Sequence, residues 1–249
     1  MTPSTPHLVR RLAALAAALA LLTGCQAISN STPRSQLRII DVSPDAPSLD
    51  LYQGSTALAY NLSFGTLTSY IAFDPGTYTI AADTAGTRQL LASSKYTFAA
   101  SAQYTVLIGN PLSSLQQIIL TDQTQPAPPG QLALRFVHQG TRSGPLDLYL
   151  VPAGQKFTTV TPLLTGLALN SNTGYLNLPI GTYTLVVEPT GSARTTASAP
   201  AYTGPQVTYS SGEARTLILI DQLPTPAPPP LPGIQVITAQ DLDSPLASS

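Results

Sequence analysis

The feature that most restricts the fold of this chain is a repeat inside its sequence. Three blocks match in the same order: 37–52 (LRIIDVSPDAPSLDLY) with 134–149 (LRFVHQGTRSGPLDLY), 70–80 (YIAFDPGTYTI) with 175–185 (YLNLPIGTYTL), and 104–110 (YTVLIGN) with 215–221 (RTLILID). Ordered matches of this kind indicate a tandem duplication of a unit of about 100 residues, a common domain size. The offset between the copies grows from 97 residues at the first block to 105 at the second. We therefore expect about eight extra residues in the second copy, around VPAGQKFTTVTP.

The pattern inside each copy is that of β-strands. Short runs rich in Val, Ile, Leu, Thr and Tyr are bounded by Gly, Pro, Asn and Asp. In GTYTLVVE, Tyr183, Leu185 and Val187 share one face, which is the period of a half-buried strand. Gly76 and Gly181 stand just before two such strands, where we expect turns with positive φ. The sequence predicts an all-β fold of two tandem immunoglobulin-like or transthyretin-like β-sandwich domains, each of seven or eight strands, with no helix after the N-terminus.

Proline-rich segments set the expected boundaries. TDQTQPAPPGQ separates the two copies as a semi-rigid spacer. QLPTPAPPPLPG (222–233) stands before IQVIT, which corresponds to the last strand of the first copy, so we predict a long loop between two paired strands. Its polyproline II character also suits a recognition segment, although such runs are more often stiff loops. The expected organisation is a signal peptide (1–24), a tether (25–36), domain 1 (37–121), a linker (122–131), domain 2 (132–240) and a tail (241–249).

The N-terminus is typical of an export signal. Arg10 and Arg11 precede an apolar run of 11 residues (12–22), which is too short to cross a bilayer as a helix. The next residues, LTGC (22–25), resemble the lipobox of bacterial lipoproteins, and Cys25 is the only cysteine of the chain. That resemblance implies cleavage before Cys25 and attachment of acyl chains, palmitate among them, that hold the protein to a membrane. The alternative is an export signal that contains a cysteine by chance.

A set of small, acidic and aromatic residues at fixed spacing marks the first copy: Ser43, Pro44, Asp45, Ala46, Pro47, Asp50, Tyr52, Phe64, Gly65, Tyr70, Pro75, Gly76 and Tyr78. The set resembles the pattern of the bacterial and archaeal family called domain of unknown function 4397. The second copy keeps Asp147, Tyr149, Gly181 and Tyr183 of this pattern, but it has QGTRSG after His138. The resemblance implies an exported β-sandwich that is often repeated in tandem. It implies no activity, because none is established for the family.

Three aspartates, Asp41, Asp45 and Asp50, cluster in DVSPDAPSLD. Their spacing differs from that of an EF-hand loop, and the prolines between them suit a rigid turn. We expect the carboxylates to cap backbone amides, the alternative being a site for a hard cation. The second copy lacks a counterpart of Asp45, which favours capping.

Two further groups of residues invite a chemical interpretation. His138 is the only histidine after the signal, and the chain has no G-x-S-x-G motif, so we expect a hydrogen-bonded histidine at a strand end. The repeated pairs Tyr52/Tyr149 and Tyr78/Tyr183 are expected to pack in the sandwich cores. The alternative for the tyrosines is a platform on which sugars stack.

Composition narrows the function. Charged residues make up 9% of the chain, and its net charge of −1 becomes about −3 once Arg10 and Arg11 are removed with the signal, so nothing indicates a nucleic-acid surface. We expect no cofactor, no metal and no catalytic residue.

The sequence predicts a lipid-anchored, non-enzymatic protein of the cell envelope, outside the cytoplasmic membrane or in an outer membrane. It would act as a structural, adhesive or interaction module, with the membrane as one partner and an envelope protein or a glycan as another. The alternatives are a substrate-binding lipoprotein of a transporter, which usually has α/β lobes, and an envelope hydrolase. A hydrolase of sugars would need paired carboxylates, and the chain has only Glu188 and Glu213 as glutamates, neither in a suggestive neighbourhood.

Overall fold

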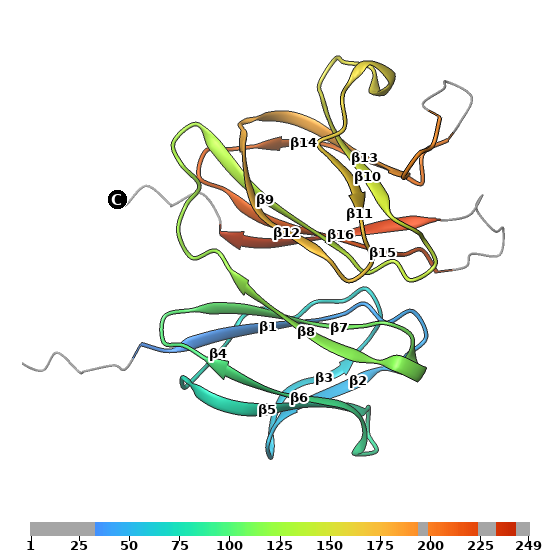
Figure 1. Cartoon of the computed structure of the whole chain (residues 1–249). Helices are drawn as coiled ribbons and strands as arrows, with labels where there is room; N and C mark the ends of the chain where they lie inside the picture. The colour runs from blue at the N-terminus through green and yellow to red at the C-terminus, as the bar shows by residue number, and fades with distance from the viewer. Residues whose placement is uncertain (1–32, 194–198, 224–232, 243–249) are drawn as a thin grey trace, which may run out of the picture. The chain divides into compact units, whose positions relative to one another are not determined.

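The computed structural model describes residues 33–193, 199–223 and 233–242 (Figure 1). The predicted signal peptide, Cys25 and most of the tether lie outside the described residues. So do most of the proline run at 222–233 and nearly all of the tail. None of the helices in the described part of the chain is long and apolar enough to cross a membrane.

The first copy forms eight strands: β1 (Ser35–Asp41), β2 (Leu49–Gln53), β3 (Thr56–Leu62), β4 (Ile71–Phe73), β5 (Gly76–Thr84), β6 (Gln89–Phe98), β7 (Gln103–Gly109) and β8 (Gln116–Asp122). They make two four-stranded sheets with the orders β4-β1-β7-β8 and β3-β2-β5-β6. The two sheets face each other in Figure 1. β1 and β7 are parallel, whereas the other pairs in both sheets are antiparallel.

The second copy repeats this arrangement with β9 (Gln131–His138), β10 (Leu146–Pro152), β11 (Leu164–Leu167), β12 (Asn172–Pro179), β13 (Gly181–Pro189), β14 (Tyr202–Tyr209), β15 (Ala214–Asp221) and β16 (Ile234–Leu242). Its sheets have the orders β12-β9-β15-β16 and β11-β10-β13-β14, and β9 and β15 form the parallel pair. Two short 3-10 helices, at Leu112–Ser114 and Phe157–Thr159, are the helical elements of the described residues. The predicted all-β fold of two β-sandwich domains is therefore confirmed.

The connections follow the sequence pattern closely. β15 pairs antiparallel with β16 so that Asp221 faces Ile234. The predicted proline-rich loop between these two strands lies mostly outside the described residues. The extra residues of the second copy form the segment 153–163 between β10 and β11, where the first copy has only Gly54 and Ser55. The strands reach slightly past the expected boundaries, because β1 begins at residue 35 and β16 continues to residue 242.

Each sandwich has its own apolar core between its two sheets. In the first, Leu37 and Ile39 of β1 pack with Leu49 and Leu51 of β2. In the second, the equivalent strands contribute Leu134 and Leu148. Every second residue of these strands points inward, as expected for strands with one face on the core.

A third buried cluster contains residues from both sandwiches. It joins Ile40 and Leu107 of the first sandwich with Val137, Ile218 and Ile220 of the second, all less than 2% exposed. These side chains lie on strand faces opposite to the two cores, so β1, β7, β9 and β15 are buried on both faces. This explains why these strands carry apolar residues on both of their faces.

Charged side chains are buried beside this third cluster. Arg38 of β1 donates to Asp241 of β16, to the Gln240 carbonyl at 2.9 Å and to the Thr105 hydroxyl at 2.8 Å. Burial lowers the pKa of Arg38, but the carboxylates of Asp241 and Asp122 raise it by more, so the guanidinium stays charged.

The same pattern recurs with the two copies exchanged. Arg135 of β9 donates to Asp122, to the Thr121 carbonyl at 2.9 Å and to the Thr216 hydroxyl at 3.0 Å. Tyr70 donates to Asp122 at 2.8 Å, and its counterpart Tyr175 donates to Asp241 at 2.7 Å. Each arginine thus pairs with the aspartate of the other copy, the reciprocal arrangement of an interface with two-fold symmetry.

Candidate binding site

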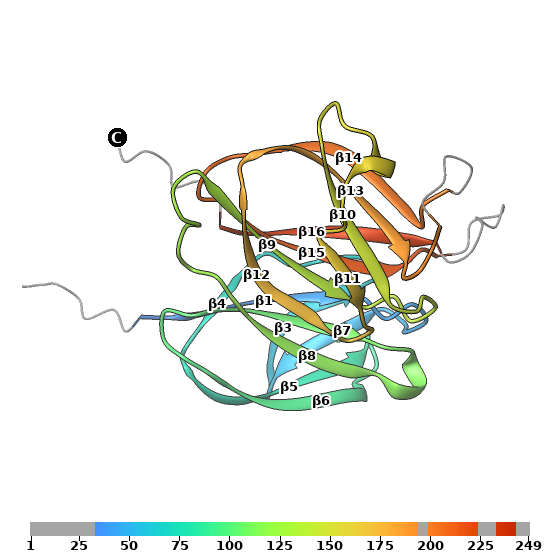
Figure 2. The ribbon, with the colours of Figure 1, turned by 45° about the horizontal axis from the view of Figure 1, so that its top comes forward.

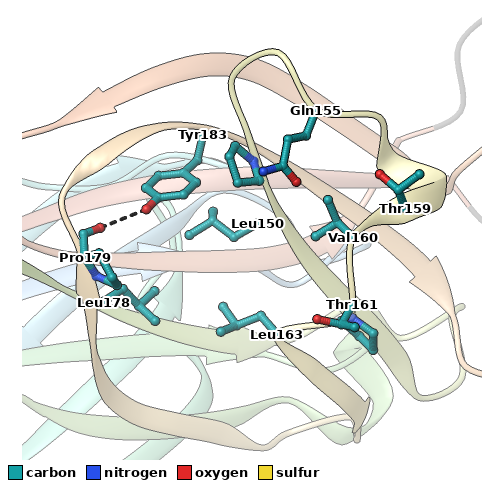
Figure 3. A pocket seen from close by; sticks show the side chains of 11 residues that line it. Leu150, Gln155, Thr159, Val160, Thr161, Leu163, Leu178, Pro179 and Tyr183 are labelled. Atoms are coloured by element: carbon teal, nitrogen blue, oxygen red, sulfur yellow. Dashed lines mark hydrogen bonds between the residues drawn. The ribbon is translucent and has the colours of Figure 1, made fainter.

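A hollow of about 490 Å³ opens in the second sandwich, beside the segment that distinguishes this copy from the first. Figure 3 shows its lining: Leu150, Pro152, Gln155, Thr159, Val160, Thr161, Pro162, Leu163, Leu178, Pro179 and Tyr183. More than half of these residues lie in or directly beside 153–163. The first copy has no such segment, so the first sandwich can be compared with the second to see what the segment 153–163 adds.

The segment 153–163 is held in place by an aromatic contact. Phe157, in its 3-10 helix, packs edge-on against Tyr149 of β10 with 4.8 Å between ring centroids. Val160 packs against the same small cluster, which Val151 and Val186 complete. In Figure 2 this loop, coloured yellow, projects beyond the end of β10. The loop that bounds the hollow is thus held to β10 through the contact of Phe157 with Tyr149.

Tyr183 forms one wall of the hollow. Its hydroxyl donates to the Pro179 carbonyl at 3.0 Å (Figure 3). A Cβ at Gly181 would lie 3.0 Å from the Tyr183 ring, so the glycine lets the ring cover the backbone. Gly76 and Tyr78 repeat this contact in the first copy. Positive φ was expected at both glycines; it is confirmed at Gly76 (152°) but wrong at Gly181, where the ring alone explains the residue.

The lining of the hollow is neutral. Leu150, Leu163 and Leu178 supply apolar surface, while Gln155 and Thr161 add an exposed amide and an exposed hydroxyl. None of the lining residues is acidic or basic. Such a site can hold a neutral ligand by hydrogen bonds and by contact with an aromatic face, but it lacks a general acid or base of its own.

The aspartates of the first copy cap backbone amides, as predicted. Asp41 accepts from the Ser43 N–H at 3.0 Å, and Asp45 accepts from the Leu112 N–H at 2.7 Å. Asp50 accepts from the N–H groups of Asn61 and Gly86 at 2.8 and 2.9 Å; these bonds, that of Gly86 first, lower its pKa. Among the described residues, no group of three or more His, Cys, Asp or Glu side chains is placed to hold a metal ion.

Other residues of the family pattern are also structural. Pro44 lies in the loop after β1, and Ser43 is buried there and donates to the Asn110 carbonyl at 2.7 Å. Asp147 accepts from the Gly166 N–H and the Thr190 hydroxyl, repeating in the second copy what Asp50 does in the first.

His138 ends β9 and is fully buried. Its Nδ1 accepts from the Gly140 N–H at 3.1 Å, so the proton of the neutral ring sits on Nε2, 3.1 Å from the Gly144 carbonyl. Burial lowers the pKa of His138. The prediction of a hydrogen-bonded histidine at a strand end is confirmed.

The four repeated tyrosines divide into two kinds. Tyr78 and Tyr183 pack against the cores of their sandwiches. Tyr52 and Tyr149 are buried too, but they lie on the opposite faces of their strands. Tyr52 is covered by the Arg88 guanidinium, 3.5 Å from the ring centroid. The prediction of core packing therefore holds for one pair, and the other pair is buried outside the cores.

Comparison with known proteins gives a family match and ten structural likenesses, among them the following two. No curated protein matches the chain in sequence. A streptococcal virulence factor whose structure reports α-glucan binding is 9% identical with a TM-score of 0.24, over 74% of this chain and 92% of that one. A family CBM26 module of Amy13K from Eubacterium rectale, solved with maltoheptaose, is 10% identical with a TM-score of 0.26, over 84% of this chain and 98% of that one. At these TM-scores the likenesses carry no argument about a ligand of this chain.

The family match covers the first sandwich together with β9 and most of β10. It includes the capping aspartates and the Gly76/Tyr78 contact described above. The segment 35–149 is thus identified as a domain of the family described as Domain of unknown function (DUF4397).

Proposed function

We propose that this protein is a lipid-anchored, non-enzymatic binding module of the cell envelope, and that its second sandwich binds a neutral glycan. The observation that carries the proposal is the hollow beside 153–163, which combines the ring of Tyr183, the Gln155 amide and the Thr161 hydroxyl with a lining free of charge. Neutral sugars are rich in hydroxyl groups and apolar on the faces of their rings, so they fit such a lining.

The anchor is supported by the sequence alone. The basic residues, the apolar run and LTGC at 22–25 fit a lipoprotein signal. Anchoring at Cys25 would confine the sandwiches near the membrane and raise their effective concentration toward other envelope components. A Cys25→Ser variant is expected to leave the membrane fraction, and its retention there would refute the anchor.

A binding role is favoured over catalysis by the chemistry of the hollow. Hydrolysis of a glycoside needs two carboxyl groups across the scissile bond, and the residues that line the hollow include none.

We also propose that the sandwiches are transthyretin-like rather than immunoglobulin-like. In the immunoglobulin fold the first two strands are neighbours in one sheet. Here β1 lies between β4 and β7, and β2 belongs to the other sheet.

The glycan proposal is tested by calorimetric titration of the purified protein with neutral α- and β-linked glucan oligosaccharides. We expect a dissociation constant of about 0.1–1 mM, the range of a shallow site. Gln155→Ala and Thr161→Ala should each weaken binding about fivefold, since each removes about one net hydrogen bond. Gln206→Ala, at an exposed amide of β14 outside the hollow, is the matched control.

Replacing 153–163 with Gly-Ser, the connection of the first copy, should abolish binding while both sandwiches stay folded. Binding that survives this replacement would refute the proposed site.

A further inference from the structure

A second hollow, of about 300 Å³, lies at one edge of the second sandwich. It opens between the two sheets, where β14 ends one sheet and β16 ends the other. Leu185, Val207, Leu217 and Val236 give it aliphatic walls. Tyr183, Tyr202 and Tyr209 add aromatic walls, and Thr238 adds a hydroxyl. None of its lining residues is charged.

At the equivalent edge of the first sandwich, two larger side chains occupy the positions that line the hollow in the second. Tyr96 faces Tyr78 across β6 and β5, as Val207 faces Tyr183 across β14 and β13. Gln117 faces Ile108 across β8 and β7, as Val236 faces Leu219 across β16 and β15. Tyr96 and Gln117 of the first copy are therefore replaced by two valines in the second.

The two replaced residues link the edges of the first sandwich. The Tyr96 hydroxyl donates to the Gln117 carbonyl at 2.9 Å. The Gln117 side-chain amide lies 3.2 Å from the carbonyls of Ile80 and Ala92, in β5 and β6. Valine can make none of these bonds and has a smaller side chain, so the second sandwich lacks both the ties and the volume that fill this edge.

The backbone of β14 also departs from regular pairing at this edge. The pairing of β13 with β14 shifts between Thr184 and Val186, opposite Gly204 and Pro205. Proline has no N–H to give to a ladder, and a bulge bends an edge strand away from its regular course. In the first copy the β5–β6 ladder runs without a shift from Gly76 to Ala82.

From these observations we propose that the edge of the second sandwich is a binding site for a single aliphatic chain, such as the tail of an amphiphile. The walls are aliphatic and aromatic and carry no charge, so burial of methylene groups supplies the binding free energy. The hollow opens between two edge strands, along which an unbranched chain can lie. This site does not depend on the glycan proposal; the two hollows share Tyr183 as a wall but have different linings.

The test is a fluorescence titration of the full chain with N-phenyl-1-naphthylamine, an uncharged apolar probe, in the presence and absence of 1-decanol. We expect one saturable site per chain and displacement of the probe by decanol. Val207→Tyr and Val236→Gln, which place the residues of the first copy at the edge, should each weaken probe binding at least tenfold. Because Val207→Tyr could disturb folding, near-ultraviolet circular dichroism is recorded for both variants. Only a variant whose spectrum matches that of the wild type is used to judge whether filling the edge weakens probe binding.

The first copy supplies the opposite control. A Tyr96→Val, Gln117→Val double variant opens the equivalent edge and should raise the number of probe sites from one to two. Displacement by phosphatidylcholine vesicles as well as by decanol would identify lipid tails as the source of the chain; displacement by decanol alone would identify a free chain.

Three results would overturn the proposal: no saturable binding, binding unchanged in a folded filling variant, or a gain of affinity in a chain ending at residue 242. A gain of affinity on removal of the residues after 242 would mean that these C-terminal residues occupy the hollow and compete with the probe. None of these results bears on glucan binding at 153–163, so failure here and failure of the proposed function can be told apart.

Discussion

Asp41 offers the sharpest test of the electrostatics of the fold. Its side chain is fully buried, one oxygen accepts from the Ser43 N–H, and the other has no hydrogen-bond partner. Burial raises its pKa from 3.8 to about 7, and the bond from Ser43 offsets only part of that effect. The folded protein therefore binds a proton at Asp41 through a pH range in which the unfolded chain has released it.

The size of the effect follows from this shift. A pKa raised on folding contributes stability that is complete below the unfolded value and is lost as pH rises through the folded value. Three pH units at about 1.4 kcal/mol each amount to about 4 kcal/mol, lost between pH 4 and pH 7. Asp41→Asn keeps an oxygen for the Ser43 N–H and does not titrate, so this loss should disappear.

The assay is thermal unfolding of the wild type and Asp41→Asn between pH 4 and pH 8. The advantage of the variant should grow from near zero at pH 4 to about 10 °C at pH 8, taking 2–4 °C per kcal/mol for a protein of this size. Asp45→Asn, at an exposed carboxylate of the same loop, is the control and should show no such trend. A constant difference between Asp41→Asn and the wild type across this range would refute the reasoning.

Three further predictions concern stability. Asp241→Ala removes the acceptor of three donors, of which Arg38 and Thr216 are buried, and should lower the free energy of unfolding by about 3–5 kcal/mol, measured by urea titration. An unchanged midpoint would contradict the buried pairing of Arg38 with Asp241. Gly181→Ala places a Cβ 3.0 Å from the Tyr183 ring and should cost about 1–3 kcal/mol, whereas Gly144→Ala, with open space around it, should be nearly neutral in the same titration. Because burial lowers the pKa of His138 from 6.5, the contribution of this residue to stability should fall as pH falls from 7 toward 5, opposite in sign to that of Asp41. His138→Asn should therefore gain stability relative to the wild type as pH falls; a constant difference between the two proteins would show that His138 does not titrate as described.

Much of the fold could be predicted because duplication repeats its signals. The blocks at 37–52 and 134–149 become β1, β2 and their counterparts β9, β10, and the change of offset locates the segment 153–163. Aspartate capping was also predictable, because Asp side chains next to turn-forming prolines are typical caps.

The features that join the two copies could not be predicted. Asp122 and Asp241 stand at the ends of the last strands, at positions that the sequence assigns to a linker and a tail, so nothing local marks them as buried. Asp241 pairs with Arg38, which lies 203 residues away in the sequence. Asp122 pairs with Arg135, which lies 13 residues away but in the other copy. The conserved spacing of Arg38 and Arg135 between copies was visible, but a buried role for them depends on contacts that only the folded chain brings together.

The position of the segment 153–163 could be predicted from the sequence, but the hollow beside it could not. The extra segment could be found by alignment of the copies, whereas its anchoring by Phe157 on Tyr149 depends on the strand face that Tyr149 occupies.

The central claim is that the second sandwich binds a neutral glycan beside 153–163. The most direct measurement is a series of 1H–15N correlation spectra of the protein recorded during titration with a neutral glucan oligosaccharide that binds in calorimetry. The claim predicts saturable shifts in 150–163 and 178–183, with none in 49–62, the equivalent strands of the first copy. Shifts of equal size in both copies, or shifts confined to residues outside the hollow, would contradict it.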